Sequence, residues 1–324
     1  MEKYYTRACN FYYGSISKLK VKNKLALSLH GYKDISFDHL EVISRKFVKK
    51  IYFKDIKKLN KNIRKKVYSD IKKIVKKKKF KKLNLLKKPL IMGILNLTPD
   101  SFSDGGKYNK QNQGINHAKK LIIDGCDIID VGGESTRPNS KTVNKIIEWK
   151  RIYPTISKLH KLKKFISLDT RKSSIMKKGL KYGVNLINDV SGLEYDSTTI
   201  NFMKKYKIPF VIHHIQGSPK NMQNNPKYKN VLLDIYDYFE KKISTIRKNG
   251  IKHNNILIDP GIGFGKNLKH NITLISKISI FHSLGFPILV GVSRKKFIKD
   301  ISGTNDSKER IGGTVSAALF CMLQ

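Results

Sequence analysis

From Pro89 onward, short apolar segments of the chain alternate with longer segments whose apolar residues recur at helical spacing. Such alternation, with glycines near the segment ends, predicts parallel strands joined by helices. Seven segments are predicted as strands: 90–95, 127–131, 165–168, 185–187, 209–212, 256–258 and 287–290. Between them, helical periodicity extends over 115–124, 142–161, 173–182, 228–249 and 268–284. Seven strand–helix units fit either an open doubly wound sheet or most of a (β/α)8 barrel.

Polar residues follow every predicted strand at its carboxyl end, where packing alone would not require them. In strand order they include Asn96, Glu134, Asp169, Asn188, His213, Asp259 and Lys295. A barrel gathers the carboxyl ends of all its strands around one site, whereas an open sheet concentrates such residues at one switch point. The sequence therefore predicts an α/β protein with a TIM-type (β/α)8 barrel and a functional site at this end.

The residue types at these positions favour binding of a flat heterocycle and an anion. Asp169, Asn188 and Asp259 carry oxygens that can accept hydrogen bonds from ring N–H and amino groups. Lys295 can donate to a ring nitrogen or a carbonyl oxygen. The glycine-rich turns, Asn96 and the nearby cations suit a phosphate or diphosphate with its metal ion. The sequence shows no Ser–His–Asp order and no Glu-x-x-His pair, so we expect no covalent enzyme intermediate.

Two of these features also have simpler interpretations. Asp169 and Asp259 could be helix N-caps, because Asp is frequent at the position before a helix. His213 and His214 could be metal ligands, although neighbouring residues on a strand point to opposite faces. The sequence alone does not distinguish carboxylates that face a site from carboxylates that cap helices, or imidazoles that share a metal from imidazoles on opposite faces.

The first 88 residues are strongly basic and lie outside the predicted barrel. They carry 28 Lys and Arg against 6 Asp and Glu, while the remaining 236 residues carry 38 against 18. Residues 1–56 are expected to form a few strands or a small appended layer, and 57–82 have the spacing of a basic amphipathic helix. The predicted division is therefore a basic N-terminal extension, 1–88, and a barrel, 89–324.

The charge has two interpretations. A basic segment can bind nucleic acid or an acidic membrane. Alternatively, the Lys-rich composition reflects AT-rich codon usage. This second interpretation is favoured because the excess of Lys persists past residue 88 and no base-reading motif is present. No specific nucleic-acid partner is therefore expected. No apolar run approaches the roughly 20 residues of a membrane helix, and the start of the chain does not resemble a secretion signal. Together with the three scattered cysteines, this predicts a cytoplasmic protein without a membrane partner.

Two motifs resemble the signatures of the dihydropteroate synthases. They read Asn96-Leu-Thr-Pro-Asp-Ser-Phe-Ser-Asp-Gly-Gly106 and Asp130-Val-Gly-Gly-Glu-Ser-Thr-Arg-Pro138. The order of Asp169-Thr, Ile187-Asn-Asp189, Asp259-Pro-Gly-x-Gly-Phe-Gly-Lys266 and Ser293-Arg-Lys295 is also similar to this family. The resemblance covers about residues 89–322. It implies a pterin-binding (β/α)8 barrel that condenses (7,8-dihydropterin-6-yl)methyl diphosphate with 4-aminobenzoate to 7,8-dihydropteroate and diphosphate in folate biosynthesis.

The resemblance also implies roles for individual residues. The pterin substrate would be held by Asp169, Asn188, Asp259, Ser293 and Lys295, with Phe264 beside the ring. Asn96 would bind Mg²⁺ and the diphosphate, and Asn96 and Lys295 would be the catalytic residues. Thr136, Arg137 and Pro138 would lie over the 4-aminobenzoate site. The family reaction is SN1-like, because diphosphate leaves the pterin methylene before the aromatic amine attacks. A homodimer is also implied.

The chain departs from the family pattern at three places. Arg171 stands where a small residue is usual, and His213-His214-Ile215 replaces Met-His-Met. The eighth strand, with its Arg-x-His pair, and the final helix are expected to be missing, so that seven strands are predicted. On this expectation the chain is an incomplete record or a poorly active, poorly stable protein. Two alternative functions stay open: a pterin-binding methyltransferase, or a catalytically impaired truncated barrel whose basic segment binds nucleic acid.

Overall fold

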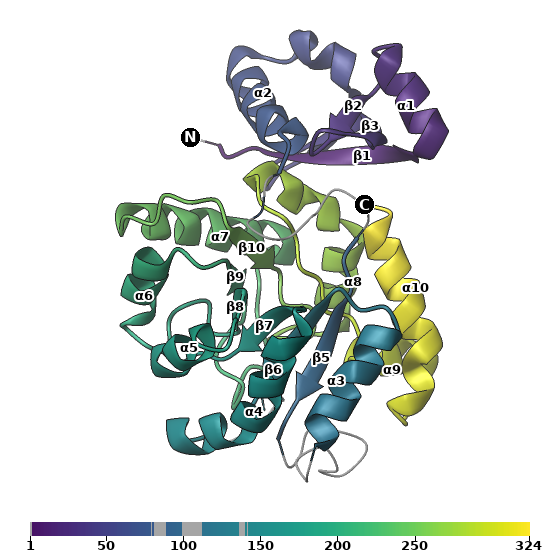
Figure 1. Ribbon diagram of the computed structural model, residues 1–324. Coiled ribbons are helices and arrows are strands. Elements are labelled where there is room, and N and C mark those ends of the chain that lie inside the picture. The colour runs from purple at the N-terminus through teal and green to yellow at the C-terminus, as the bar shows by residue number, and fades with distance from the viewer. Residues whose placement is uncertain (1, 79, 81–88, 99–111, 136–139, 141) are drawn as a thin grey trace.

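The computed structural model describes the chain except residues 1, 79, 81–88, 99–111, 136–139 and 141 (Figure 1). Its larger part contains a parallel sheet with the strand order β10-β9-β8-β7-β6-β5. The strands are β5 (Met92–Asn96), β6 (Ile128–Gly132), β7 (Phe165–Asp169), β8 (Leu186–Asp189), β9 (Phe210–His213) and β10 (Ile256–Asp259). Each strand pairs with the next one along the chain, which is the topology of a (β/α) barrel.

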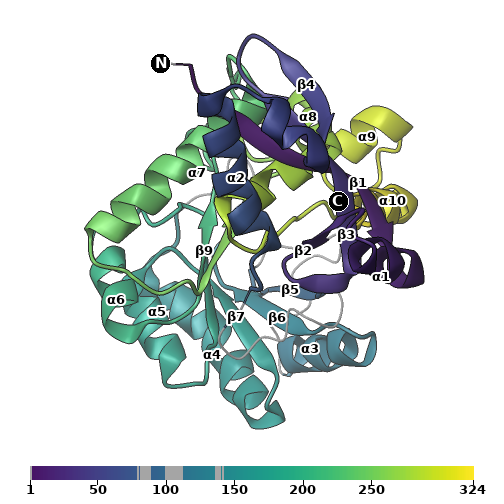
Figure 2. The same ribbon diagram turned by 90° about the horizontal axis from the view of Figure 1, so that it is seen from above.

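Helices connect these strands on the outside of the sheet. They are α3 (Gln113–Ile123), α4 (Lys145–Leu159), α5 (Ser173–Leu180), α6 (Thr199–Tyr206), α7 (Val231–Lys248) and α8 (Leu268–Ser276), followed by the 3-10 helix η4 (Ile278–Leu284), α9 (Lys296–Ser302) and α10 (Ile311–Met322). The view from above shows α3 to α7 around the strands (Figure 2). Apolar side chains such as Leu95, Val131 and Leu168 are fully buried between sheet and helices, while alternate residues face the barrel interior.

The first six predicted strands and four of the predicted helical segments are confirmed, with shifts of a few residues at their ends. The fifth segment, 268–284, is divided into α8 and the 3-10 helix η4. Helix α6 was not predicted, although Thr199, Phe202 and Met203 are buried at helical spacing. The prediction of a strand at 287–290 is wrong. Only one parallel bridge, between Ile258 and Ile288, is present there. The ladder stops early because Pro287 has no N–H to donate and Gly291 follows within three residues.

The basic N-terminal residues form an antiparallel sheet with two helices. The strands β1 (Tyr5–Tyr13), β2 (Leu27–Leu29) and β4 (Val48–Tyr52) all pair with the long strand β3 (Tyr32–Ile43). Helix α1 (Gly14–Lys22) and the 3-10 helix η1 (Phe53–Lys58) lie between strands or follow them. The predicted basic helix is α2 (Lys61–Val75), which begins where the Asn60 side chain accepts a hydrogen bond from Ile63 N, 3.0 Å away.

This N-terminal layer lies at the amino ends of the barrel strands, opposite their carboxyl ends (Figure 1). Tyr5 packs edge-on against Tyr236, with ring centroids 5.1 Å apart, and its hydroxyl donates to Asp237 at 2.9 Å. Arg45 forms ion pairs with Asp234 and Asp237 of α7. The predicted boundary between residues 88 and 89 adjoins residues outside the described part, so it stays a prediction.

Phe80 closes the amino end of the barrel. Its side chain is 7% exposed and clusters with Leu186, Val211 and Leu257, which face the barrel interior on three adjacent strands. We expect Phe80→Leu to lower the free energy of unfolding by about 1–1.5 kcal/mol, because the smaller side chain leaves part of this space empty. Urea unfolding measures the change. The control Phe47→Leu alters a ring that is 38% exposed and should change stability by less than ~0.5 kcal/mol. Equal effects of the two variants would contradict the role of Phe80.

None of the described helices is both long and apolar enough to cross a lipid bilayer.

Candidate active site

The strand register brings the predicted polar residues together at the carboxyl end of the sheet. Asn96 lies opposite Gly132, Gly132 opposite Asp169, and Asp169 opposite Asn188. Between β8 and β9 Asn188 lies opposite Val211, so that His213, and Asp259 opposite it, lie two residues further toward the carboxyl end. Because alternate residues of a strand share a face, these side chains point into the barrel while Val131, Leu168 and their equivalents point out. Four of the predicted site residues, Asn96, Asp169, Asn188 and Asp259, are therefore brought to this end of the barrel.

The alternative that the carboxylates cap helices is wrong. Helix α5 begins after Lys172, and the side chain of Asn267 caps α8. Asp259 instead accepts a hydrogen bond from Gly261 N at 2.7 Å, within the turn that follows its own strand.

Asp130 is a buried member of the site to which the sequence analysis gave no role. It lies on β6, two residues before Gly132 and therefore on the same inner face, and is 3% exposed. Its Oδ2 accepts a hydrogen bond from Asn188 Nδ2 at 3.0 Å. This bond turns the amide oxygen of Asn188 away from Asp130, which leaves it free to accept from a ligand. Strand periodicity alone could have identified the position.

Asp169 carries an unusual charge environment. Burial, together with the nearby carboxylates of Asp130 and Glu148, raises its pKa well above the ordinary value. Burial likewise raises the pKa of Asp130. Shifts of this kind, caused by burial and by neighbouring like charges, are typical of functional sites.

Lys295 faces the same end of the barrel from the loop before α9. Its Nζ lies 4.7 Å from the centroid of the Phe264 ring and donates to Ile262 O. Burial lowers the pKa of Lys295 to about 8, although Asp259 acts in the opposite direction. Gly263 is required for this approach, because a Cβ there would lie 2.9 Å from Lys295 Cδ.

The two neighbouring histidines have separate environments. The His213 ring packs edge-on against Phe264, with centroids 4.6 Å apart. His214 Nδ1 lies 3.0 Å from Nζ of Lys266, which also donates to Phe264 O at 2.8 Å. Burial lowers the pKa of both imidazoles, to about 4 for His213. Among the described residues no group of three or more His, Cys, Asp or Glu is arranged for a metal. His213 contacts the Phe264 ring and His214 contacts Lys266, so both histidines support the turn that contains Phe264.

Behind the site lies a buried ion-pair network that the sequence analysis did not predict. Lys172, 8% exposed, lies between Glu134 and Glu148, which are 6% and 0% exposed. Its Nζ is 2.9 Å from Glu134 Oε2 and also bonds Glu148. Burial alone would raise the pKa of Glu134, but hydrogen bonds from Arg171 and Lys172 outweigh it and hold this pKa below the ordinary value.

Four predicted site residues remain: Ser293, Thr136, Arg137 and Pro138. Ser293 is exposed on the loop before α9. Thr136, Arg137 and Pro138 lie outside the described residues.

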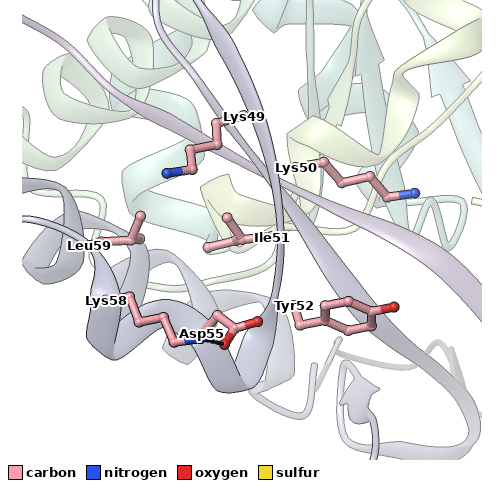
Figure 3. Close-up of a pocket in the computed structure, with 7 residues that line it drawn as sticks. All are labelled: Lys49, Lys50, Ile51, Tyr52, Asp55, Lys58 and Leu59. Atoms are coloured by element: carbon pink, nitrogen blue, oxygen red, sulfur yellow. Dashed lines mark ion pairs between the residues drawn. The ribbon is translucent and has the colours of Figure 1, made fainter.

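A hollow of about 260 Å³ lies on the N-terminal layer, beside β4 and η1 (Figure 3). It is basic, but Lys49 and Lys50 extend away from each other (Figure 3). Lys58 is paired with Asp55 at 2.8 Å. Because the cations do not converge, we assign no site to this hollow.

Known proteins that are similar to this chain in sequence are pterin binding enzymes. A sequence model of the pterin binding enzymes matches residues 92–324. Dihydropteroate synthase of Escherichia coli K12 is 39% identical over 240 residues, which are 74% of this chain and 84% of that protein. The enzyme of Neisseria meningitidis serogroup C is 42% identical over 237 residues, 72% of this chain and 84% of that protein.

Solved structures give the same result. Yersinia pestis dihydropteroate synthase in complex with a sulfonamide drug superposes with a TM-score of 0.71 at 37% identity, covering 75% of this chain and 89% of that chain. The Xanthomonas albilineans enzyme in complex with 7,8-dihydropteroate gives a TM-score of 0.65 at 31% identity, covering 74% and 86%. The fold, the two motifs and these likenesses agree, and the chain belongs to the dihydropteroate synthases, within the family of pterin binding enzymes.

Proposed function

We propose that this chain is a transferase that joins (7,8-dihydropterin-6-yl)methyl diphosphate to 4-aminobenzoate, releasing 7,8-dihydropteroate and diphosphate in folate biosynthesis (EC 2.5.1.15). The observation that carries the proposal is the convergence of Asp169, Asn188, Asp259 and Lys295 at the carboxyl ends of the strands. Related structures with 7,8-dihydropteroate and with 4-aminobenzoic acid support this choice of substrates.

The site offers hydrogen-bond acceptors for the N–H groups of the pterin ring and one cation for an acceptor atom on that ring. Asp259 and the amide oxygen of Asn188 accept from the ring N–H and amino groups, and the Asn188 amide is held in this orientation by Asp130. Lys295 donates to an acceptor on the ring. Phe264 lies against the Lys295 ammonium and offers an apolar edge to the heterocycle. Ser293 lies in the loop before α9 that also contains Lys295, and its motif assigns it to the substrate.

The chemistry requires no protein nucleophile. The bond between the pterin methylene carbon and the diphosphate oxygen breaks, and its electron pair leaves with diphosphate. The lone pair of the aromatic amine then forms the new carbon–nitrogen bond, and that nitrogen releases one proton. The residues contribute by orienting the reactants and by placing the Lys295 charge near the site, effects that are large where water is excluded. Thr136, Arg137 and Pro138 are assigned to 4-aminobenzoate by their motif.

The site also fits a divalent cation. The Oδ1 of Asn96 and the Oδ2 of Asp169 both face Gly132, where a Cβ would lie 3.3 Å from each oxygen. The missing side chain leaves room beside two oxygen donors, and Mg²⁺ prefers a few protein oxygens together with substrate phosphates. We assign Asn96, with Asp169 beside it, to Mg²⁺, which when bound neutralises charge on the leaving diphosphate.

We further propose a cytoplasmic homodimer. Helix α10 exposes Val315, Leu319 and Phe320 to about half of their possible area, and an exposed apolar face of this kind is typical of a protein–protein contact.

The pH dependence of pterin binding tests the assignment of Lys295. Because burial lowers its pKa to about 8, the ammonium is present below that pH and is lost as the pH rises through it. We expect the affinity for a pterin to fall above this value, by up to about tenfold per pH unit. Isothermal titration calorimetry measures it. Lys295→Met should bind the pterin weakly at every pH, and its affinity should not show this decrease. Titration of the pterin itself would change the affinity of both proteins alike. Identical slopes would exclude Lys295 as the group responsible.

A further inference from the structure

His213 is a buried polar residue of the site to which the proposed function gives no contact with a substrate. It lies two residues after Val211, which faces the barrel interior, so its side chain points the same way. It lies opposite Asp259 in the strand register, and its ring packs edge-on against Phe264, with centroids 4.6 Å apart. The imidazole therefore lies beside two of the residues that the proposed function assigns to the pterin ring.

The described residues leave a polar atom of this ring without a partner. His213 is 4% exposed, and its Nδ1 has no hydrogen-bond partner within the described part of the chain. Its Nε2 lies 3.9 Å from Asp259 Oδ2, which is longer than a hydrogen bond. A buried ring nitrogen without a partner costs stability, and such groups are rare in folded proteins. A ligand bound in the site can supply the missing partner.

The imidazole is uncharged at neutral pH. Burial lowers the pKa of His213 to about 4, and Lys295 and Lys266 act in the same direction, while Asp259 and the backbone of Val190 act against them. A neutral imidazole has one donor nitrogen and one acceptor nitrogen. It can therefore hydrogen-bond a neutral heterocycle without placing a second cation beside Lys295.

We propose that Nδ1 of His213 hydrogen-bonds the pterin ring, which makes His213 a specificity-determining residue for the heterocycle. The proposal deepens the proposed function and rests on it. Met is usual at this position in the family pattern, and its thioether is only a weak acceptor, so the contact is a property of the histidine in this chain. The neighbouring His214 points to the opposite face of the strand and bonds Lys266, so His213 alone of the two reaches the ligand.

Calorimetric binding of 7,8-dihydropterin to the purified chain tests the proposal, because this ligand has the ring without the diphosphate. His213→Met keeps a side chain of similar length against Phe264 but removes Nδ1, so we expect the affinity to fall about tenfold. His213→Asn carries an amide atom as many bonds from Cα as Nδ1 and should restore most of the affinity. His213→Gln carries its amide atoms further from Cα and should restore less. A purely structural role would not rank Asn above Gln in binding.

Nuclear magnetic resonance of isotope-labelled imidazole nitrogens gives a readout that does not depend on stability. The Nδ1 resonance of His213 is identified as the one missing from His213→Met. Adding 7,8-dihydropterin should shift this resonance, because a hydrogen bond changes the electron density at the nitrogen. An Nδ1 resonance that stays unchanged when the chain is saturated with 7,8-dihydropterin would overturn the proposal.

His282→Met is the matched control. His282 is also buried, at 9% exposure, but it lies in η4, where its ring nitrogens are 2.9 Å from His30 Nε2 and 2.8 Å from Gln324 O. Its replacement should lower thermal stability and change the affinity for 7,8-dihydropterin by less than about twofold, because distant sites act independently. Equal losses of affinity in His213→Met and His282→Met would contradict a direct contact of His213 with the ring.

Product formation, measured with the same proteins, separates this proposal from the proposed function. If the wild-type chain binds 7,8-dihydropterin but forms no dihydropteroate, the proposed function fails, and weaker binding by His213→Met still supports the hydrogen bond. If product forms and the two proteins bind 7,8-dihydropterin equally, the hydrogen bond alone is excluded. If the folded wild-type chain neither binds 7,8-dihydropterin nor turns over, both fail.

Discussion

Replacing Lys295 by Met should lower kcat/KM for the pterin diphosphate by about 10²–10³, because it removes a half-buried cation from the place where charge develops. The structure supports this because the ammonium lies over Phe264 and near Asp259, at the carboxyl ends of the strands. Met fills a similar volume, so the fold should be retained. Steady-state rates at pH 7, with thermal unfolding measured in parallel, give the comparison.

The neighbouring residue offers a matched control. Lys296 is exposed at the start of α9, and Lys296→Met removes the same charge from the next position in the chain without touching the site. Its kcat/KM should stay within about twofold of wild type. A Lys295→Met protein that folds and retains full activity would exclude Lys295 from the catalytic machinery.

Replacing Lys172 by Ala should be strongly destabilising. Lys172 lies between Glu134 and Glu148 with almost no exposure of any of the three, so its removal leaves Glu148 buried without its cation and Glu134 paired with Arg171 alone. Breaking a buried pair in this way costs about 3–5 kcal/mol. Urea unfolding at neutral pH measures the loss. The double variant Lys172→Ala with Glu148→Gln should recover part of it, since it removes the charge that is left unpaired.

The same prediction has a pH signature. The pKa of Glu134 is held below its ordinary value of 4.5, so its ion pairs stabilise the folded state fully above that pH. This contribution is lost as the pH falls through the folded-state pKa. The stability difference between wild type and Lys172→Ala should therefore narrow below pH 4.5. A difference that stays constant or widens in acid would contradict the assigned ion pairs.

Much of the site could be predicted from the sequence because two local rules act together. Strand periodicity of two residues places Asp169 and Asp259 on the inner face, and parallel strands deliver their carboxyl ends to one edge. The same rules identify Asp130, but its role required the hydrogen bond to Asn188, a residue 58 positions away. The pairing of Lys172 with two glutamates depends on tertiary contacts in the same way.

Other differences have tertiary causes as well. The predicted helix 268–284 is divided into α8 and η4, and η4 is where β1 and α2 of the N-terminal layer pack. The Arg7 side chain, for example, donates to Ser279 Oγ of η4 at 3.2 Å. Helical periodicity within one segment cannot report a surface contributed by residues more than 200 positions earlier. The insertion of Phe80 into the barrel end is a contact of the same long-range kind.

The most direct test of the proposed function is product formation by the purified chain supplied with (7,8-dihydropterin-6-yl)methyl diphosphate, 4-aminobenzoate and Mg²⁺. The site geometry predicts one diphosphate released for each 7,8-dihydropteroate formed, with no dihydropteroate when 4-aminobenzoate is omitted. Asp259→Asn, measured alongside, should reduce both products together. A folded chain that binds a pterin but forms no dihydropteroate would contradict the proposed reaction, and one that binds no pterin would contradict the site itself.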